Sequence, residues 1–408
     1  MTLPPRSTLF FRSRSSKKGQ ISIQFNWIFV LIVGVIIFGF FLTTINTTSQ
    51  TSQTKVSVTI AKSFQTIFTS SAQKDATVKT FATPQGTLAF TCSDSAGFYD
   101  YRFNDYVVDQ IKYDLIVGPK ELVGNQLFTY TEKWSLGFDV GTFLYATNED
   151  TAYVFSQEQQ SKSTISSNAE TSSDHLMTSY RDFLNVFPTN FTKIIVEDET
   201  DIEALSSQRY AHYVVFAFEE QDVFSILDKL PSDDVTVVHI KPLIPSDVFG
   251  AGMVSVYGGS QVPTNWPTIA FDDKKTDDAS FEDQVDTYES SHTAPYLGKA
   301  SLFAAVFSQD INMYRCTMNK ALKKSYLLSS LLYNKTLNQS HHVSHVCQDL
   351  LGVGDLSGPV DHVQTIRDSS SSSNRWTLSV AQTLKDASTK LSKTNAELYI
   401  SGTCPVIY

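Results

Sequence analysis

The segment KKGQISIQF, at residues 17–25, leads directly into an uncharged apolar stretch, Phe25–Leu42, in which Asn26 is the one strongly polar residue. As a helix this stretch is roughly 27 Å long, at about 1.5 Å per residue. That length is close to the ~30 Å hydrocarbon core of a lipid bilayer. The sequence therefore predicts a single transmembrane helix at residues 20–43, and this helix decides where the rest of the chain lies.

Positive charge lies on one side of this helix only. The leader, residues 1–19, contains five basic residues and no acidic residue. They are Arg6, Arg12, Arg14, Lys17 and Lys18. Under the positive-inside rule, the leader stays in the cytoplasm and the C-terminal domain is extracytoplasmic. The residues after the helix lack the small-residue cleavage pattern of a secretory signal, which favours a retained, single-pass anchor in the cell membrane.

The motif Lys-Lys-Gly-Gln followed by a long apolar helix resembles the class III signal peptide of archaeal type IV pilin-like proteins. The resemblance implies that a prepilin-type signal peptidase cuts after Gly19 and leaves Gln20 as the new N-terminus, with the helix kept in the mature protein. Many pilins carry Glu at the fifth mature position, where this chain has Gln24. The resemblance therefore supports processing more directly than filament assembly. The alternative is an uncleaved signal anchor.

The body of the protein is acidic. Of the 32 basic residues in the chain, the leader holds five, and the remaining 27 stand against 42 acidic residues. Phosphate recognition needs a basic surface, so this balance argues against nucleic acid as a partner. The composition, with 41% hydrophobic and 12% aromatic residues, is that of a folded protein, and the abundance of Phe and Tyr favours β-sheet.

After the membrane helix we expect an α+β ectodomain with mixed and antiparallel sheets and long C-terminal helices. Its predicted parts are a polar stalk, a helix with a strand-rich part, a small α/β part, and a long-helix hairpin with a final helix, at residues 44–54, 55–190, 191–290 and 291–408 respectively. Apolar residues at helical spacing predict an amphipathic helix at Lys55–Ser71. The residues at 157–174, rich in Ser and Gln, predict a loop or a mobile insert.

Strand-length apolar runs make up much of the middle of the chain. Between residues 106 and 156 they are separated by turn-forming residues, which predicts a meander. Further on, the runs Lys193–Val196, Tyr213–Phe218 and Val235–Ile240 are of strand length, and a helix-like segment that Pro231 stops separates the last two. This alternation predicts a small βαβ unit with some parallel pairing.

Helical periodicity returns near the C-terminus. One long helix is predicted from about Tyr296 to Leu337. In the last helix, apolar residues alternate steps of four and three between Val380 and Leu398, which is the pattern of a coiled-coil seam. Because this seam is short and contains Thr394, packing against the domain's own long helix is favoured over an intermolecular coiled coil.

The chain has four cysteines, Cys92, Cys316, Cys347 and Cys404, and an even count in an exported domain predicts disulfides. Three pairings are possible. A helical hairpin would bring Cys316 and Cys347 together, so this bridge is preferred, and Cys92 is left with Cys404. The second bridge would contribute roughly 5 kcal/mol in the chain-entropy account and tie the C-terminus close to the membrane-proximal sheet.

Four Asn-x-Ser/Thr sequons, at Asn46, Asn190, Asn334 and Asn338, are candidate glycosylation sites in an exported protein. Asn46 lies in the predicted stalk and the other three lie in the ectodomain. In a chain rich in Ser and Thr several such triplets arise by chance, so we expect about half of them to carry a glycan.

The sequence contains no G-x-S-x-G, Walker loop, dinucleotide-binding glycine motif or H-E-x-x-H motif. The best metal candidates are His341 and His345, which are one helical turn apart and close to Cys347. A structural metal site needs four ligands, and a disulfide would occupy Cys347. Surface or adventitiously binding histidines are therefore the favoured interpretation.

Two further groups of polar residues have simple structural explanations. The acidic run Asp272–Asp278 lacks the spacing and the glycine of an EF-hand, so it predicts an exposed loop. His212 and His239 lie on apolar strands and are expected in the core or at a sheet edge. We therefore predict no enzymatic activity, no metal site and no cofactor.

Several patches in the C-terminal part resemble a group of uncharacterised exported proteins from archaea with reduced genomes. They are Tyr296–Lys299, Phe303–Asp310, Tyr314–Met318 and Cys404–Tyr408. The resemblance implies a shared membrane-anchored ectodomain that includes the Cys316–Cys347 hairpin, and it implies no activity.

These features predict a single-span, pilin-like cell-surface protein with a structural or interaction role. Its expected partners are the lipid bilayer, a prepilin-type signal peptidase, and other pilin-like subunits or surface proteins. One alternative is a membrane-anchored solute-binding protein, in which the alternating section at residues 191–260 forms half of a ligand cleft. A less favoured alternative is an extracytoplasmic hydrolase, which would need a pocket with convergent His, Asp and Ser groups.

Overall fold

The chain forms two compact units, Met1–Thr59 and Ile60–Tyr408. The computed structural model describes residues 18–71, 76–83, 86–93, 98–104, 106–112, 115–156, 181–196, 199–205, 207, 209–218, 224–230, 234–242, 247–258, 292–340, 347, 351, 358–371, 374–401 and 404. The loops predicted at 157–174 and 272–278, and the histidines at 341 and 345, lie outside these residues. The described part of the first unit is helical, and the second unit contains all the described strands.

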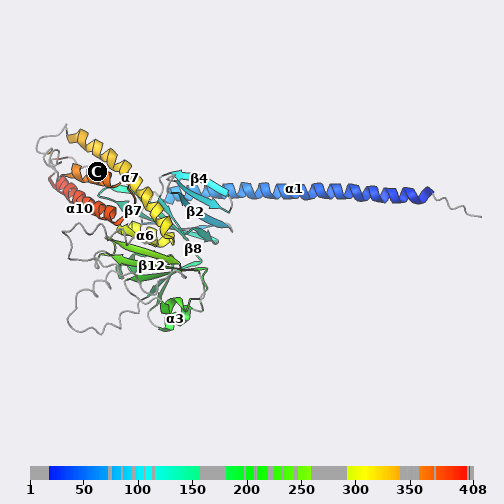
Figure 1. The fold of residues 1–408 in the computed structure, drawn as a ribbon, viewed down its shortest axis with the longest axis horizontal. Coiled ribbons are helices and arrows are strands. Elements are labelled where there is room, and N and C mark those ends of the chain that lie inside the picture. The colour runs from blue at the N-terminus through cyan, green and yellow to red at the C-terminus, as the bar shows by residue number, and fades with distance from the viewer. Residues whose placement is uncertain are drawn as a thin grey trace, which may run out of the picture. The chain divides into compact units, whose positions relative to one another are not determined.

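Helix α1, Lys18–Ser71, is continuous over 54 residues (Figure 1). The predicted polar stalk at residues 44–54 is therefore part of the helix. These residues are polar but contain no Gly or Pro, the two residue types that most strongly interrupt a helix. Near its end the helix joins the second unit, where Phe64 is buried and its ring lies 5.8 Å from that of Phe103.

The strand-rich part forms two four-stranded sheets, with strand orders β1-β7-β8-β5 and β4-β3-β2-β6. The strands are β1 Val78–Ala82, β2 Thr87–Ser93, β3 Phe98–Phe103, β4 Tyr106–Lys112, β5 Leu115–Val117, β6 Glu121–Val123, β7 Gln126–Ser135 and β8 Asp139–Asn148. Neighbouring strands are antiparallel except for β5 and β8. The meander predicted between residues 106 and 156 is wrong: β4 to β8 are divided between these two sheets, and only β7 and β8 are both consecutive and neighbouring. Side chains of both sheets share one hydrophobic cluster, which also contains Phe64 of α1.

A third sheet has six strands in the order β10-β9-β11-β12-β13-β14. The strands are β9 Thr151–Ser156, β10 Thr192–Val196, β11 His212–Phe218, β12 Val235–Pro242, β13 Ala251–Gly258 and β14 Thr293–Leu297. The first four in this order are parallel, which confirms the predicted parallel pairing, and β13 and β14 run antiparallel. This sheet therefore takes strands from three of the four predicted parts of the ectodomain, residues 55–190, 191–290 and 291–408.

Helical segments cover both faces of the six-stranded sheet. Residues 181–186 are helical, and Phe183 packs on one face, with its ring 5.4 Å from that of Phe216. On the other face, α3 (Glu199–Leu205) and α4 (Phe224–Leu227) bury apolar side chains in a separate cluster. Figure 1 shows β12 between α6 and α3. The parallel part is thus a small doubly wound sheet, in which the first strand, β9, lies between β10 and β11.

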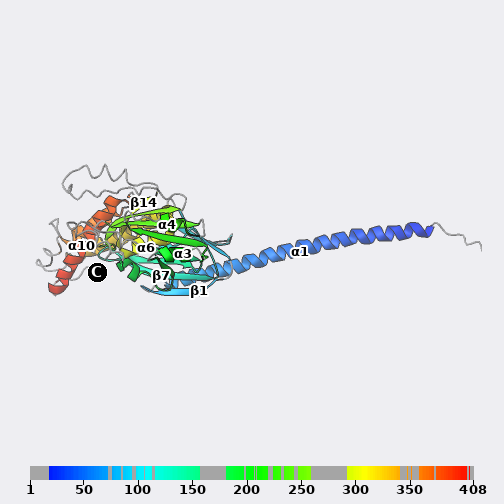
Figure 2. The ribbon, with the colours of Figure 1, turned by 90° about the horizontal axis from the view of Figure 1, so that it is seen from below.

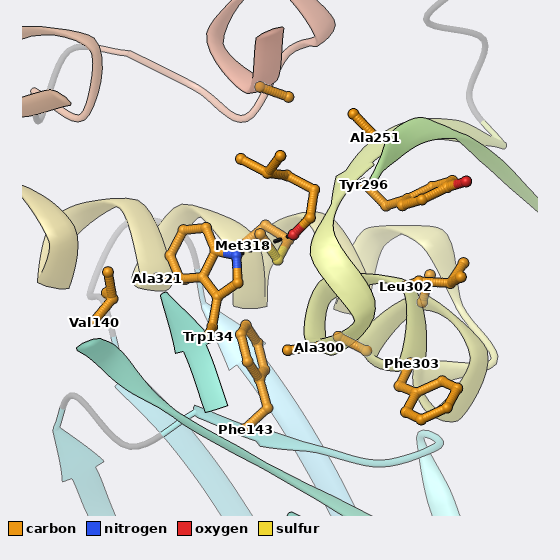
Figure 3. Close-up of a cluster of buried hydrophobic side chains, with 14 of the residues drawn as sticks. Trp134, Val140, Phe143, Ala251, Tyr296, Ala300, Leu302, Phe303, Met318 and Ala321 are labelled. Atoms are coloured by element: carbon orange, nitrogen blue, oxygen red, sulfur yellow. Dashed lines mark hydrogen bonds between the residues drawn. The ribbon is translucent and has the colours of Figure 1, made fainter. Parts of the chain in front are cut away.

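Helix α6, Gly298–Ser308, occupies the centre of the second unit. It contacts β7 and β8 of one sheet and β13 and β14 of another, and Figure 2 shows it between β14 and β7. Every residue from Ala300 to Ser308 is buried, because sheets lie on opposite sides of the helix. Figure 3 shows Trp134 in this core, where its indole Nε1 donates a hydrogen bond of 3.1 Å to the carbonyl of Leu297.

The single long helix predicted from Tyr296 to Leu337 is wrong. Tyr296 lies in β14, and the helical region is divided into α6 and α7 (Ile311–Ser340). The break occurs at Gln309, which has a left-handed φ of 52°. The carboxylate of Asp310 then accepts hydrogen bonds from the first amides of α7, and such capping starts a new helix.

The C-terminal helices are α9 (Pro359–Ser369) and α10 (Leu378–Ser401). The predicted seam of α10 is buried within the chain, with Leu384 and Leu391 fully inaccessible to solvent. Its main helical neighbour is α9, and it also contacts β13 and β14. Packing within the domain is therefore confirmed, but α9 takes the place that was predicted for the long helix.

Candidate functional site

The apolar part of α1 is exposed. No side chain from Trp27 to Thr44 is buried, and Ile36, near the middle, is 65% exposed. Apolar surface in water costs roughly 25 cal/mol per Å², so a helix that is apolar on all sides needs apolar surroundings. The segment is long and apolar enough to cross a membrane, as the sequence predicts.

The two hydroxyl groups at the end of this segment are satisfied within the helix. Thr43 donates to the carbonyl of Gly39, and Thr44 donates to that of Phe40, both at 2.8 Å. Hydrogen bonds of this kind remove the need for water, which makes the two threonines compatible with the edge of a hydrocarbon layer.

The predicted processing residues lie at the start of α1. Gly19 and Gln20 are in its first turn, immediately before the apolar segment, and Gln24 follows in the next turn. Their backbone is helical.

The four cysteines form two disulfides, but the preferred pairing is wrong. Cys92 pairs with Cys316 and Cys347 pairs with Cys404, with Cα atoms 6.0 Å and 5.4 Å apart. Cys316 lies in the second turn of α7, a helix that packs against β2, and β2 carries Cys92. The bridge therefore joins a sheet to a helix, where the sequence suggested a bridge within a helical hairpin.

A polar groove of about 490 Å³ lies where three substructures meet. One wall comes from β6 and the residues before it. A second wall comes from the amino ends of β9, β11 and β12, and the α6–α7 junction supplies Gln309 and Asp310. The groove is lined by four carboxylates and one lysine: Glu121, Asp150, Asp234, Asp310 and Lys120.

His212 and Asp234 form a pair in this groove. His212 Nδ1 is 3.0 Å from a carboxylate oxygen of Asp234. Because a carboxylate only accepts hydrogen bonds, Nδ1 carries the proton, and in the neutral ring Nε2 is an acceptor. Burial lowers the pKa of His212, while the charge and hydrogen bond of Asp234 act in the opposite direction. The imidazole is thus held in one tautomer and favours its neutral form.

The wall around this pair is fixed by hydrogen bonds. The amide of Asn148 donates to the carbonyl of Val123 at 2.5 Å and accepts from the hydroxyl of Thr151 at 2.6 Å. The carbonyl of Asp150 accepts from the backbone amides of Ala211 and His212. These bonds connect β6, β9 and β11, so the groove has a defined shape.

The other predicted polar residues do not add to the groove. His239 is 2% exposed on β12, which confirms its expected place in the core. Within the described ranges, no group of three or more His, Cys, Asp or Glu side chains is arranged to hold a metal ion. A second polar hollow, of about 690 Å³, lies between α9 and α10 and includes His362.

The sequons occupy different environments. Asn190 is exposed in a turn before β10, whereas Asn334 and Asn338 are exposed on α7. Asn46 lies within α1. The hydroxyl of Thr336, the third residue of the Asn334 sequon, is buried and bonds to the carbonyl of Leu332.

No protein-family model matches this chain, and no similarity to a curated protein or to a solved structure was found. The function is therefore inferred from the chain's own features.

Sequence reasoning did not identify the groove. Its lining residues extend from Pro119 to Asp310 and come together only through the topology of two sheets. The sequence predicts His212 in the core or at a sheet edge, but no spacing connects it to Asp234. The pairing follows from the parallel register of β11 and β12, which places the residue before β12 beside the first residue of β11.

Proposed function

We propose that the protein is a single-span, pilin-like cell-surface protein with a structural or interaction role and no enzymatic activity. The observation that carries the proposal is the exposed apolar segment Trp27–Thr44 within the continuous helix α1. The basic leader before it and the Lys-Lys-Gly-Gln motif support class III processing after Gly19. The proposed partners are the bilayer, a prepilin-type signal peptidase and other pilin-like subunits or surface proteins.

The two disulfides support an extracytoplasmic ectodomain, because disulfides persist mainly in oxidising compartments. The charge asymmetry across the apolar segment supports the same orientation, with the N-terminus in the cytoplasm. In this orientation the exposed asparagines Asn190, Asn334 and Asn338 are accessible glycosylation candidates. We place the protein among surface proteins of archaeal type on the strength of the signal motif.

N-terminal mass spectrometry of the protein from the membrane fraction tests the processing step. The expected result is a mature chain that begins at Gln20, with Gly19→Leu as the variant that remains uncleaved. An intact Met1 terminus, or a terminus beyond Thr43, would contradict the pilin-like proposal. Protease treatment of intact cells tests orientation, because an extracytoplasmic ectodomain is degraded while the cytoplasmic leader is protected.

One observation favours a second function, that of a membrane-anchored solute-binding protein. The strand order β10-β9-β11-β12, with helical segments on both faces, creates a topological switch point between β9 and β11. In doubly wound sheets, ligands bind outside the carboxyl ends of the strands at such a point. A ligand-dependent rise in the melting temperature of the ectodomain would support this function.

A further inference from the structure

We propose that the polar groove between β6, the amino ends of β9, β11 and β12, and the α6–α7 junction is a binding site for a hydroxyl-rich ligand, namely a carbohydrate. It lies at the edge of the parallel strands opposite to their carboxyl ends, so it is distinct from a switch-point cleft. The proposal does not depend on the membrane anchor, because all the lining residues belong to the unit Ile60–Tyr408.

The groove has the properties of a built site. Its walls come from three substructures and are connected by hydrogen bonds through Asn148 and Thr151. Ligand sites occur preferentially at such junctions and combine a defined shape with a few convergent polar groups. Gln309, at the α6–α7 junction, is one of three non-glycine residues with a positive φ in the described part of the chain. Backbone strain of this kind concentrates at functional sites.

Nε2 of His212, a buried side-chain nitrogen at this groove, has no hydrogen-bond partner in the structure, and the buried Nε2 of Gln309 has no hydrogen bond of good geometry, although its side chain interacts with the Tyr153 hydroxyl. Buried polar atoms are normally paired, so each one calls for a partner. His212 Nε2 is an acceptor, because Nδ1 carries the proton that bonds to Asp234. The amide nitrogen of Gln309 is a donor. A hydroxyl group donates one hydrogen bond and accepts others, so it suits both atoms.

The charges of the groove select against other ligand classes. Four carboxylates against one lysine disfavour phosphates and other anions. Among the described residues of the groove, no three His, Asp or Glu side chains are arranged to hold a metal ion. Carboxylates and amides along its length are hydrogen-bond partners for several hydroxyl groups at once. Since both nitrogens are buried, we expect the Gln309 side chain to rotate when a hydroxyl reaches them.

Saturation-transfer difference NMR on the full-length protein in phosphatidylcholine nanodiscs tests the proposal. Glycoside detergents are avoided because their headgroups are sugars. The probes are glucose, galactose, mannose and N-acetylglucosamine, with methyl phosphate and spermidine as an anionic and a cationic control. We expect a signal from at least one sugar and from neither control.

Gln309→Gly is the decisive variant. It removes the amide, and glycine adopts the left-handed backbone without strain, so the melting temperature should stay the same or rise. Sugar binding should weaken about fivefold, the effect of one hydrogen bond. His212→Gln should weaken binding similarly, whereas His362→Gln, in the hollow between α9 and α10, should leave it unchanged. The proposal fails if no sugar gives a signal, if Gln309→Gly and His212→Gln both bind as the parent does, or if methyl phosphate or spermidine binds in the groove instead.

Discussion

The Trp27–Thr44 segment of α1 and the helix α6 are both predominantly apolar, but their surroundings are opposite. No side chain in the α1 segment is buried, whereas every residue of α6 from Ala300 to Ser308 is. At 11 residues α6 is too short to cross a bilayer, and two sheets supply its apolar surroundings. The α1 segment has the length for a membrane span, and none of the described residues buries it. The two helices therefore differ in their length and in the protein surface that covers them, more than in their hydrophobicity.

The largest effect should come from a charge placed in α6. Ala305 is fully buried, so Ala305→Arg would bury an unpaired cation and should destabilise the second unit by roughly 5 kcal/mol or more. Circular dichroism and protease resistance should show an unfolded ectodomain that is still held in the membrane. Leu331→Arg, at a position on α7 that is 67% exposed, is the matched control and should be nearly neutral. Equal behaviour of the two variants would show that α6 is not buried.

The second-largest effect should come from the disulfides, which also distinguish the two regions. Both bridges lie in the second unit, and the α1 segment contains no cysteine. Removing Cys92–Cys316 with a double alanine variant should cost about 5 kcal/mol in guanidinium unfolding, and removing Cys347–Cys404, which closes a shorter loop, about 4 kcal/mol. Membrane attachment should not change in either variant.

The double variant Cys316→Ala, Cys347→Ala decides between the pairings. It breaks both bridges of the structure but only one bridge of the pairing preferred from the sequence. Mass spectrometry should therefore find two free thiols, at Cys92 and Cys404. A surviving bridge between these two residues would contradict the structure.

A charge in the α1 segment should have a smaller and different effect. Ile36→Arg lies near the middle of the segment and should make membrane insertion less favourable by about 3 kcal/mol. More of the protein should then be extracted by alkaline carbonate, while the melting temperature of the ectodomain stays the same. Val58→Arg, on the same helix outside the apolar segment, provides the control. A drop in ectodomain melting with Ile36→Arg would indicate that the segment packs on protein.

The smallest effect concerns pH. The pKa of His212 is lowered by burial, so the folded state binds a proton less readily than the unfolded state. Its contribution to stability is present above the unfolded pKa of about 6.5 and is lost as the pH falls below it. His212→Gln should flatten the decrease in melting temperature between pH 7 and pH 5. The α1 segment has no titratable side chain, so its membrane attachment should not depend on pH in this range.

The elements that the sequence predicts well are those with a strong local signal. The apolar stretch before Leu42 and the runs that form β11 and β12 have uninterrupted hydrophobic patterns, which tertiary contacts do not override. The last helix was predicted for the same reason, since its apolar seam has to be buried.

The features that the sequence did not predict correctly depend on contacts between residues that are distant in the chain. The sequence has no Gly or Pro at Gln309, so it gives no local signal for the break. The left-handed turn is held by the packing of α6 and the capping by Asp310. The disulfide pairing depends on how α7 packs against β2, which spacing along the chain does not encode. The groove combines residues from Pro119 to Asp310 for the same reason.

The connectivity of the disulfides has a consequence for how the protein matures. In chain order the first two cysteines are bonded to each other, Cys92 to Cys316, and so are the last two, Cys347 to Cys404. During N-to-C translocation across the membrane, as the proposed orientation requires, the first pair is complete before Cys347 emerges. An oxidase that joins cysteines in order of appearance makes both native bonds directly. Maturation of this protein should then need a thiol oxidase but no disulfide isomerase.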